Sequence, residues 1–155
     1  MLKPDSLRKA LTESVPVLSK NPEMLRLFID NGKINSTLAA SLSFEKQYTL
    51  NVVVTDFTDD FDLLLVPVLA WLREQQPDIM TSEEGRKKGF TWYADINTDQ
   101  SFDVSISLLL TERTIVKQVD NALHVNCVSE PPPAEPVTRP TAMYINGELL
   151  SQFNE

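Results

Sequence analysis

The stretch Phe90–Leu110, FTWYADINTDQSFDVSISLLL, contains two runs in which every second residue is apolar. The even positions are apolar from 90 to 96 and again from 102 to 110, and the polar residues 98–101 separate the two runs. Strict alternation places one set of side chains on one face of a strand, and a turn-forming break between two such runs is typical of a β-hairpin. We therefore predict an antiparallel hairpin with one buried face at this position.

Two segments upstream predict further strands. Residues 25–29 alternate up to Asn31-Gly32, a dipeptide that favours a type I′ turn because both central residues need positive φ, so we expect a strand pair around that turn. The even positions are also apolar from 38 to 44 and from 50 to 54, on either side of Glu45-Lys46-Gln47. This pattern predicts a second hairpin with its turn at residues 45–47.

The N-terminal segment predicts a first helix. Apolar residues at helical spacing form one stripe, Asp5 or Ser6 is a candidate N-cap, and Pro16 is expected to kink or stop the helix. The members of the stripe are Leu7, Ala10, Leu11, Val15 and Leu18. Downstream of the clear hairpin, residues 123–128 predict one more short strand.

A second helix is predicted within Asp59–Asp78, DDFDLLLVPVLAWLREQQPD, with its start at one of the aspartates and its end near Gln76. Its ten positions from 63 to 72 hold only apolar residues and one proline. A helix with a single buried stripe needs about half as many apolar positions. We expect Trp71 in the buried stripe and more than one covered face, either by the core itself or by another subunit. The fold class is thus α+β: two layers, a mainly antiparallel sheet of hairpins packed with two helices.

Composition limits the function classes. The chain has 155 residues, with 14 Lys and Arg against 22 Asp and Glu, and a net charge of −8. This balance argues against nonspecific binding to nucleic acid or an anionic membrane, both of which need clustered positive charge. A single cysteine gives no internal disulfide, and the N-terminus has no apolar segment typical of a secretory signal, so we expect a soluble protein from a reducing compartment.

The C-terminal segment differs from the rest, and we divide the chain into a domain at 1–128 and an arm at 129–155. Residues 129–140, SEPPPAEPVTRP, hold half of the ten prolines and predict an extended arm of roughly 3 Å per residue. Asn146-Gly147 then predicts a small hairpin, which needs a surface to dock on. We expect the arm to pack on a neighbouring subunit or another protein, with docking on its own domain as the alternative. The candidate interface residues are Pro133, Pro136, Tyr144, Ile145, Leu149 and Phe153.

Candidate catalytic and metal-ligating residues are few. His124 and Cys127 form H-x-x-C, but the chain has one His and one Cys, whereas a closed zinc site needs four ligands. The aspartates of residues 56–62 lack the spacing of a calcium loop and are expected to serve turns and a helix start. Arg86-Lys87-Lys88, between two glycines, is expected to be a solvated loop. We therefore expect no catalytic residue, no metal and no cofactor.

Several long stretches, taken in order, identify a family resemblance. They are FIDNG, TLAASLSFEKQYTLNVVVTDF, DFDLLLVPVLAWLREQQPDI, GFTWYADINTDQSFDVSISLLLTERT, SEPPPAEPVTRP and YINGEL. Together they resemble the tail completion protein R family of temperate, contractile-tailed phages of enteric bacteria. The resemblance implies a non-enzymatic component of the virion tail, assembled in the host cytoplasm, that completes the tail at its head-proximal end and makes it competent for head joining.

The resemblance also implies partners. They are other tail proteins, namely the tube, the sheath or the head–tail connector, together with further copies of the chain. Tail terminators, which the order of elements resembles, act as rings, typically of six, and DNA passes through such a ring without specific binding. Two alternatives stay open: an assembly chaperone or adaptor absent from the mature virion, and a metal-dependent hydrolase using the carboxylates of residues 56–62.

Overall fold

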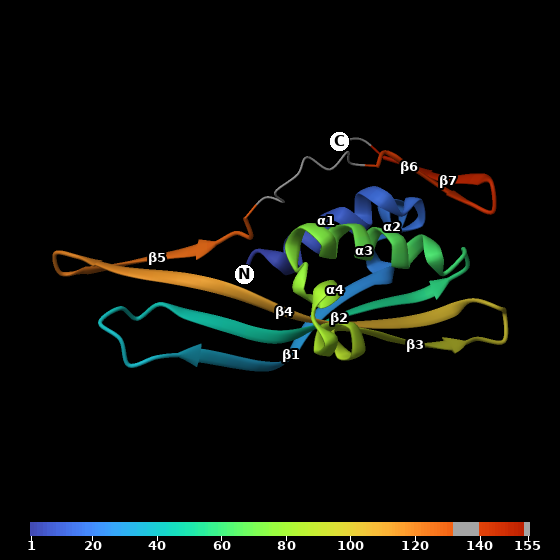
Figure 1. The fold of residues 1–155 in the computed structure, drawn as a ribbon. Helices are drawn as coiled ribbons and strands as arrows, with labels where there is room; N and C mark the ends of the chain where they lie inside the picture. The colour runs from blue at the N-terminus through green and yellow to red at the C-terminus, as the bar shows by residue number, and fades with distance from the viewer. Residues whose placement is uncertain (132–139, 154–155) are drawn as a thin grey trace.

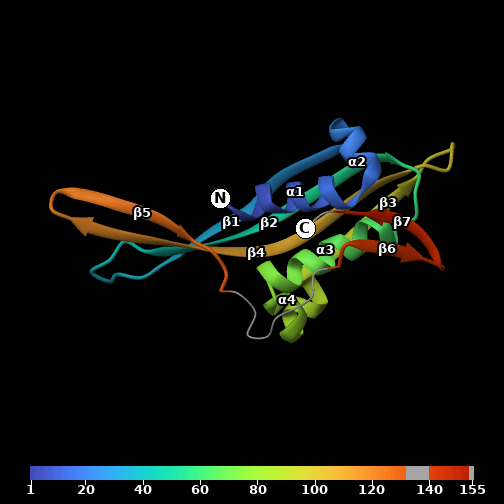
Figure 2. The ribbon, with the colours of Figure 1, turned by 90° about the horizontal axis from the view of Figure 1, so that it is seen from above.

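The fold is α+β, an antiparallel sheet with helices packed on one face (Figures 1 and 2). The computed structural model describes residues 1–131 and 140–153. The helical elements are α1 (Lys3–Ser14), α2 (Pro16–Lys20), η1 (Pro22–Met24), α3 (Asp62–Gln75), α4 (Asp78–Thr81) and η2 (Gly85–Gly89). The strands are β1 (Leu25–Ser36), β2 (Phe44–Phe57), β3 (Phe90–Ile96), β4 (Phe102–Val119), β5 (Ala122–Val128), β6 (Ala142–Ile145) and β7 (Glu148–Gln152).

The long strand β4 organises the sheet. The order is β1-β2-β4-β3, and β5 also pairs with β4. β3 pairs with residues 102–108 of β4 and β5 with residues 113–119, so β3 and β5 lie end to end along the same edge of β4. At one end, the β4–β5 hairpin and the β1–β2 hairpin project beyond the helices (Figure 1). Residues 109–112 of β4 have no strand beside them on this edge, which leaves a gap between β3 and β5.

The core lies between the sheet and the helices α1, α2 and α3. The even positions of β2 and β4 point into it, as alternation requires. α3 buries Leu64, Val68, Trp71 and Leu72, which confirms the predicted stripe, while Val66 and Leu69 face outward. The Trp71 indole N–H donates to Ser6 Oγ at 3.0 Å and so joins α3 to α1.

The predicted hairpins have mixed outcomes. The hairpin in residues 90–110 is confirmed, with β3 and β4 paired from Phe90↔Leu108 to Ile96↔Phe102. The predicted strand at 123–128 is confirmed as β5, closed on β4 by a turn at Asp120-Asn121. The turn at Asn146-Gly147 is confirmed as well, because both residues have positive φ, 52° and 81°, and they join β6 to β7.

The two turns predicted upstream are wrong. Asn31 does take a positive φ of 51°, but the register shift between Asp30 and Lys33 makes the site a β-bulge inside β1. Two residues, Asn31 and Gly32, there oppose one residue of β2, so the strand continues instead of turning back. Residues 45–47 lie within β2, and the connection between β1 and β2 is residues 37–43.

The start of α1 also differs from expectation. Neither Asp5 nor Ser6 caps the helix, which begins at Lys3 with Leu2 as N-cap. The carboxylate of Glu112 on β4 accepts the Leu2 and Lys3 backbone N–H groups at 2.6 and 3.2 Å. No local signal could have predicted this cap, because it comes from 110 positions away in the sequence. Pro16 does mark a break, between α1 and α2, as expected.

The C-terminal hairpin docks on its own domain through one face (Figures 1 and 2). Met143 is buried in the core cluster, Ile145 and Leu150 pack against that cluster, and Ser151 Oγ donates to the backbone carbonyl of Ser14 on α1. Met143 also lies in a small hollow beside Pro67 and Trp71 of α3. The hairpin therefore covers part of the long apolar run in α3. The second covered face expected for this helix is thus provided by the same chain.

Candidate assembly surface

The residues that could have carried chemistry do not converge. His124 and Cys127 are both exposed on β5, and since they are three positions apart in a strand they point to opposite faces. Asp60 Oδ1 accepts the Asp62 backbone N–H at 2.9 Å at the start of α3. Among residues 1–131 and 140–153, no three His, Cys, Asp or Glu side chains are grouped so that they could hold a metal ion.

The basic run at residues 86–88 lies in the exposed turn η2. Its flanking glycines serve packing: a Cβ at Gly85 would stand 2.7 Å from the Asp78 carbonyl oxygen. Lys87 Nζ pairs with Glu83 at 2.8 Å, an exposed helix-type pair. These contacts give the run a local structural role. They do not bring its three basic side chains together around a site for a phosphate.

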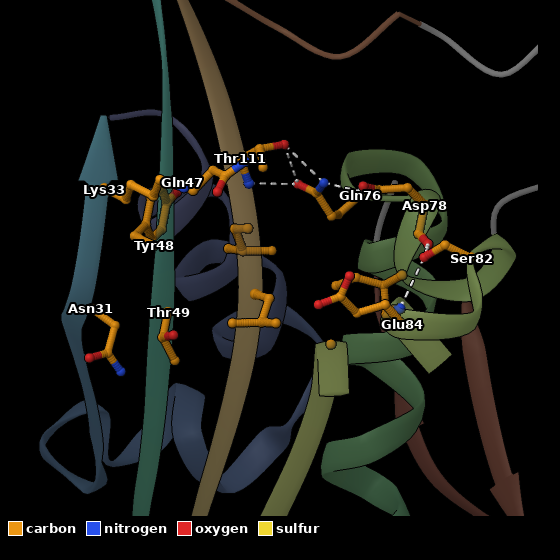
Figure 3. A pocket seen from close by; sticks show the side chains of 15 residues that line it. Asn31, Lys33, Gln47, Tyr48, Thr49, Gln76, Asp78, Ser82, Glu84 and Thr111 are labelled. Atoms are coloured by element: carbon orange, nitrogen blue, oxygen red, sulfur yellow. Dashed lines mark hydrogen bonds between the residues drawn. The ribbon is translucent and has the colours of Figure 1, made fainter. Parts of the chain in front are cut away.

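A hollow of about 460 Å³ lies between β1, β2 and β4 on one side and α4 with η2 on the other (Figure 3). Lys33, Asp78 and Glu84 are its charged lining residues, and hydroxyl and amide side chains make up most of the remainder. Figure 3 shows the Gln76 and Thr111 side chains hydrogen-bonded to each other at the wall. The lining contains no His and no Cys.

Next to this hollow is a buried polar junction that fills the gap between β3 and β5. Gln76 Oε1 accepts the Thr111 backbone N–H at 3.0 Å, and Lys3 Nζ donates to the Thr111 carbonyl oxygen at 2.6 Å. Lys3 Nζ also contacts Gln76 Oε1 at 2.6 Å and Glu130 Oε1 at 3.0 Å. Two side chains thus replace the missing strand neighbour of Thr111, and the start of the C-terminal arm is tied to α1.

Glu112 and Tyr48 complete the junction. The Tyr48 hydroxyl donates to Glu112 Oε2 at 2.7 Å, and burial, followed by this bond and the negative charge of Glu112, raises the pKa of Tyr48. Burial acts to raise the pKa of Glu112, but the hydrogen bonds from Tyr48, Leu2 and Lys3 and the charge of the N-terminal amino group outweigh it. The pKa of Glu112 is therefore lowered, and the carboxylate stays ionised as the cap of α1.

A group of exposed apolar residues lies in the projecting strands. We call β4 residues 113–119, the turn and β5 the projecting hairpin; all of β5 is exposed, including Leu123 and Val125 at 56% and 61%. The neighbouring loop of residues 37–43 exposes Leu38 and Leu42. Apolar side chains held away from the body are typical of protein interaction sites. Sequence reasoning missed this surface because Leu123, Val125 and Cys127 alternate with polar residues, a pattern that predicts one buried face, whereas all of β5 is exposed.

The C-terminal hairpin offers a second, smaller surface. Tyr144 and Leu149 are directly opposite each other on β6 and β7 and are both exposed, at 65% and 47%. Ile145 and Phe153 are half-buried against the domain. Of the expected interface residues, Tyr144 and Leu149 are thus the ones that face solvent, while Pro133 and Pro136 lie outside the described residues.

These features define an α+β protein whose exposed strands suit assembly and whose described residues form no catalytic arrangement. The model of the P2 phage tail completion protein R (GpR) family matches residues 1–131, so the chain belongs to this family, and phage tail completion is its function. Tail completion protein R of Escherichia phage P2 is 75% identical over 155 residues, which cover 100% of both chains. No solved structure matches the chain. None of the helices in the described parts of the chain has the length and apolar character that a bilayer crossing requires.

Proposed function

We propose that this protein completes the tail as a non-enzymatic subunit at the head-proximal end, where it makes the tail competent to join a filled head. The observation that carries the proposal is the projecting hairpin with its exposed apolar side chains, since a monomeric enzyme would have no use for it. The sheet is elongated and its two ends differ, so one end of a subunit can contact the other end of the next subunit. Such head-to-tail contacts fit a tail-terminator-like fold whose copies form a ring of six.

The outer face of the C-terminal hairpin, with Tyr144 and Leu149, is the part of the arm that we assign to a partner in the tail, namely the tube, the sheath or the head–tail connector. Aromatic side chains such as Tyr144 bury a large area at little conformational cost and are enriched at interfaces. The net charge of −8 supports DNA passage without adhesion, because a lumen with negative charge repels phosphates.

Complementation of a phage that lacks the gene tests the proposal. The wild-type chain restores infectious particles, whereas without it we expect tails and filled heads to accumulate unjoined. Protein composition of purified virions then separates a structural subunit, which is retained, from an assembly chaperone, which is absent. Recovery of joined particles that lack the protein would contradict the structural role.

The hydrolase alternative is tested with the same protein. Asp59→Asn and Asp60→Asn are expected to leave the protein folded, because an asparagine Oδ1 still accepts the backbone N–H that Asp60 accepts at the start of α3. DNA cleavage by the wild type that disappears in either variant would contradict a purely structural function.

A further inference from the structure

The outer edge of β5 carries backbone groups without partners in the described chain. Val119 and Ala122 form the last pair before a two-residue turn, and in such a hairpin that pair exchanges both hydrogen bonds. By alternation, the N–H and C=O groups of Leu123, Val125 and Cys127 point away from β4. Hydrogen bonds from them to other parts of residues 1–131 or 140–153 are absent.

Elsewhere along β4, positions without a strand neighbour are capped by side chains. Thr111 is bonded by Gln76 and Lys3, as described above. Beyond the end of β2, the Val116 N–H donates to Ser43 Oγ at 2.9 Å and its carbonyl oxygen accepts from Ser41 Oγ at 3.0 Å. At these two positions of β4, side chains take the place of a missing strand neighbour, whereas the outer edge of β5 has no such side-chain partners among the described residues.

The sequence of β5 also lacks the usual protection of an edge strand. ALHVNCV contains no Pro, Lys, Glu or Asp, and its pairing with β4 has no bulge. A flat, apolar edge of this kind is a template for another strand. An edge left open in this way points to a partner that supplies a strand by β-augmentation.

The charges point to a second copy of this chain as that partner. The projecting hairpin carries Arg113 and Lys117 against Asp120, in a chain of net charge −8; Arg113 also pairs with Glu45 of β2 at 3.9 Å, so Lys117 is the basic residue that the contact relies on. At the opposite end of the sheet, residues 47–72 and 89–112 contain no Lys or Arg. The aspartates of that end are Asp56, Asp59, Asp60, Asp62, Asp95, Asp99 and Asp103. The two ends are opposite in charge and far apart, as Figure 1 shows, so they can meet only between molecules.

The acidic end also has an open strand edge. β3 lies at the edge of the sheet, has the same seven-residue length as β5, and exposes the side chains of Trp92, Tyr93 and Ile96. Because β3 and β5 share one edge of β4, the same alternation points the backbone groups of Trp92, Ala94 and Ile96 outward. Both ends therefore offer an unpaired, apolar edge.

We propose that β5 of one copy pairs edge to edge with β3 of the next copy, head to tail, with the basic projecting hairpin against the acidic end. This inference rests on the proposed function and specifies the subunit contact. β3 and β5 are two segments of the same edge of β4, and the contact joins unlike segments of the two copies. A ring forms when each copy makes its two contacts with different neighbours.

The test uses two full-length variants that each block one edge. Val125→Pro and Ala94→Pro remove an outward N–H and leave the pairing with β4 intact, as proline at an edge position can. Native mass measurement is expected to show an oligomer for the wild type and monomers for each variant alone. In a 1:1 mixture, the open β3 of Val125→Pro can pair with the open β5 of Ala94→Pro. We therefore expect a species of twice the 17.5 kDa chain mass and nothing larger. Circular dichroism and thermal melting confirm folding.

Several outcomes would overturn the inference. A dimer of Ala94→Pro alone would mean that β5 pairs with β5, and a wild type that stays monomeric up to its solubility limit would exclude a second copy. Neither result touches tail completion, which is judged by complementation. If a proline variant does not fold, Lys117→Glu and Asp95→Lys replace it. Each is expected to weaken association about two- to fivefold alone, and their mixture to restore heteromeric pairing at low salt. No change in either charge variant would also contradict the contact.

Discussion

The helix-covered body and the projecting hairpin use the same long strand in opposite ways. In the body, β4 is bordered by β2 and β3, and where a neighbour is missing at Thr111 the buried side chains of Lys3 and Gln76 take its place. In the projecting hairpin, β4 is bordered on its outer side only by β5, whose own outer edge is open. Stability is therefore concentrated in the body, whereas the hairpin is where we propose the assembly contact, and substitutions can separate the two.

The largest loss of stability is expected for Trp71→Ala. The side chain is 7% exposed, lies between α3 and α1, and donates to Ser6, so truncation leaves a large cavity. We expect a loss of about 3–5 kcal/mol in the free energy of unfolding, measured by urea denaturation. Leu69→Ala, on the outward face of the same helix, is the matched control and is expected to cost under about 1 kcal/mol. Equal losses would show that the helix has no buried stripe.

A smaller loss is expected at the C-terminal hairpin, whose two faces can be compared directly. Met143→Ala removes a buried contact with the core and is expected to cost about 2–3 kcal/mol. Tyr144→Ala, on the outer face, is expected to change stability by less than about 0.5 kcal/mol while reducing complementation. Urea denaturation and phage titre are the two measurements. A Tyr144 variant with full complementation would remove the outer face from the proposed interface.

The polar junction is expected to contribute next, in a pH-dependent way. Glu112→Gln removes a charge-assisted cap of α1 and is expected to cost about 1–3 kcal/mol at neutral pH. Because the pKa of Glu112 is lowered by folding, its contribution is present above the unfolded pKa and is lost as pH falls through the folded pKa. Wild type and variant should therefore converge in stability on acidification. Glu13→Gln, an exposed carboxylate on α1, should show no such convergence.

The smallest effect on stability is expected in the projecting hairpin. Val125→Thr keeps a β-branched residue on an exposed strand and is expected to shift the free energy of unfolding by less than about 0.5 kcal/mol. The corresponding change at a buried strand position, Val52→Thr, buries a hydroxyl among apolar neighbours and should cost more, about 1–3 kcal/mol. Thermal melting of the two variants measures this contrast. Equal losses would mean that β5 is as integrated into the fold as β2.

The local units of this protein could be predicted from its amino-acid sequence. The strand alternation on either side of residues 97–101, the positive-φ preference of Asn146-Gly147 and the dense apolar run of α3 act within a few residues of chain, and the structure has each of them. The family was also identifiable from sequence, because long ordered stretches carry it.

How those units meet depends on contacts between residues that are far apart in the chain. Asn31-Gly32 has the same turn preference as Asn146-Gly147, yet pairing along β2 on both sides turns it into a bulge, since a long ladder of hydrogen bonds outweighs a local preference. The cap of α1 by Glu112 and the replacement of a strand by Lys3 and Gln76 join residues far apart in sequence. Likewise, the outer edge of β5 is open because β5 pairs with β4 on one side and with no described strand on the other. Pairings across such separations leave no periodic trace in the chain, which is why they had to be seen in three dimensions.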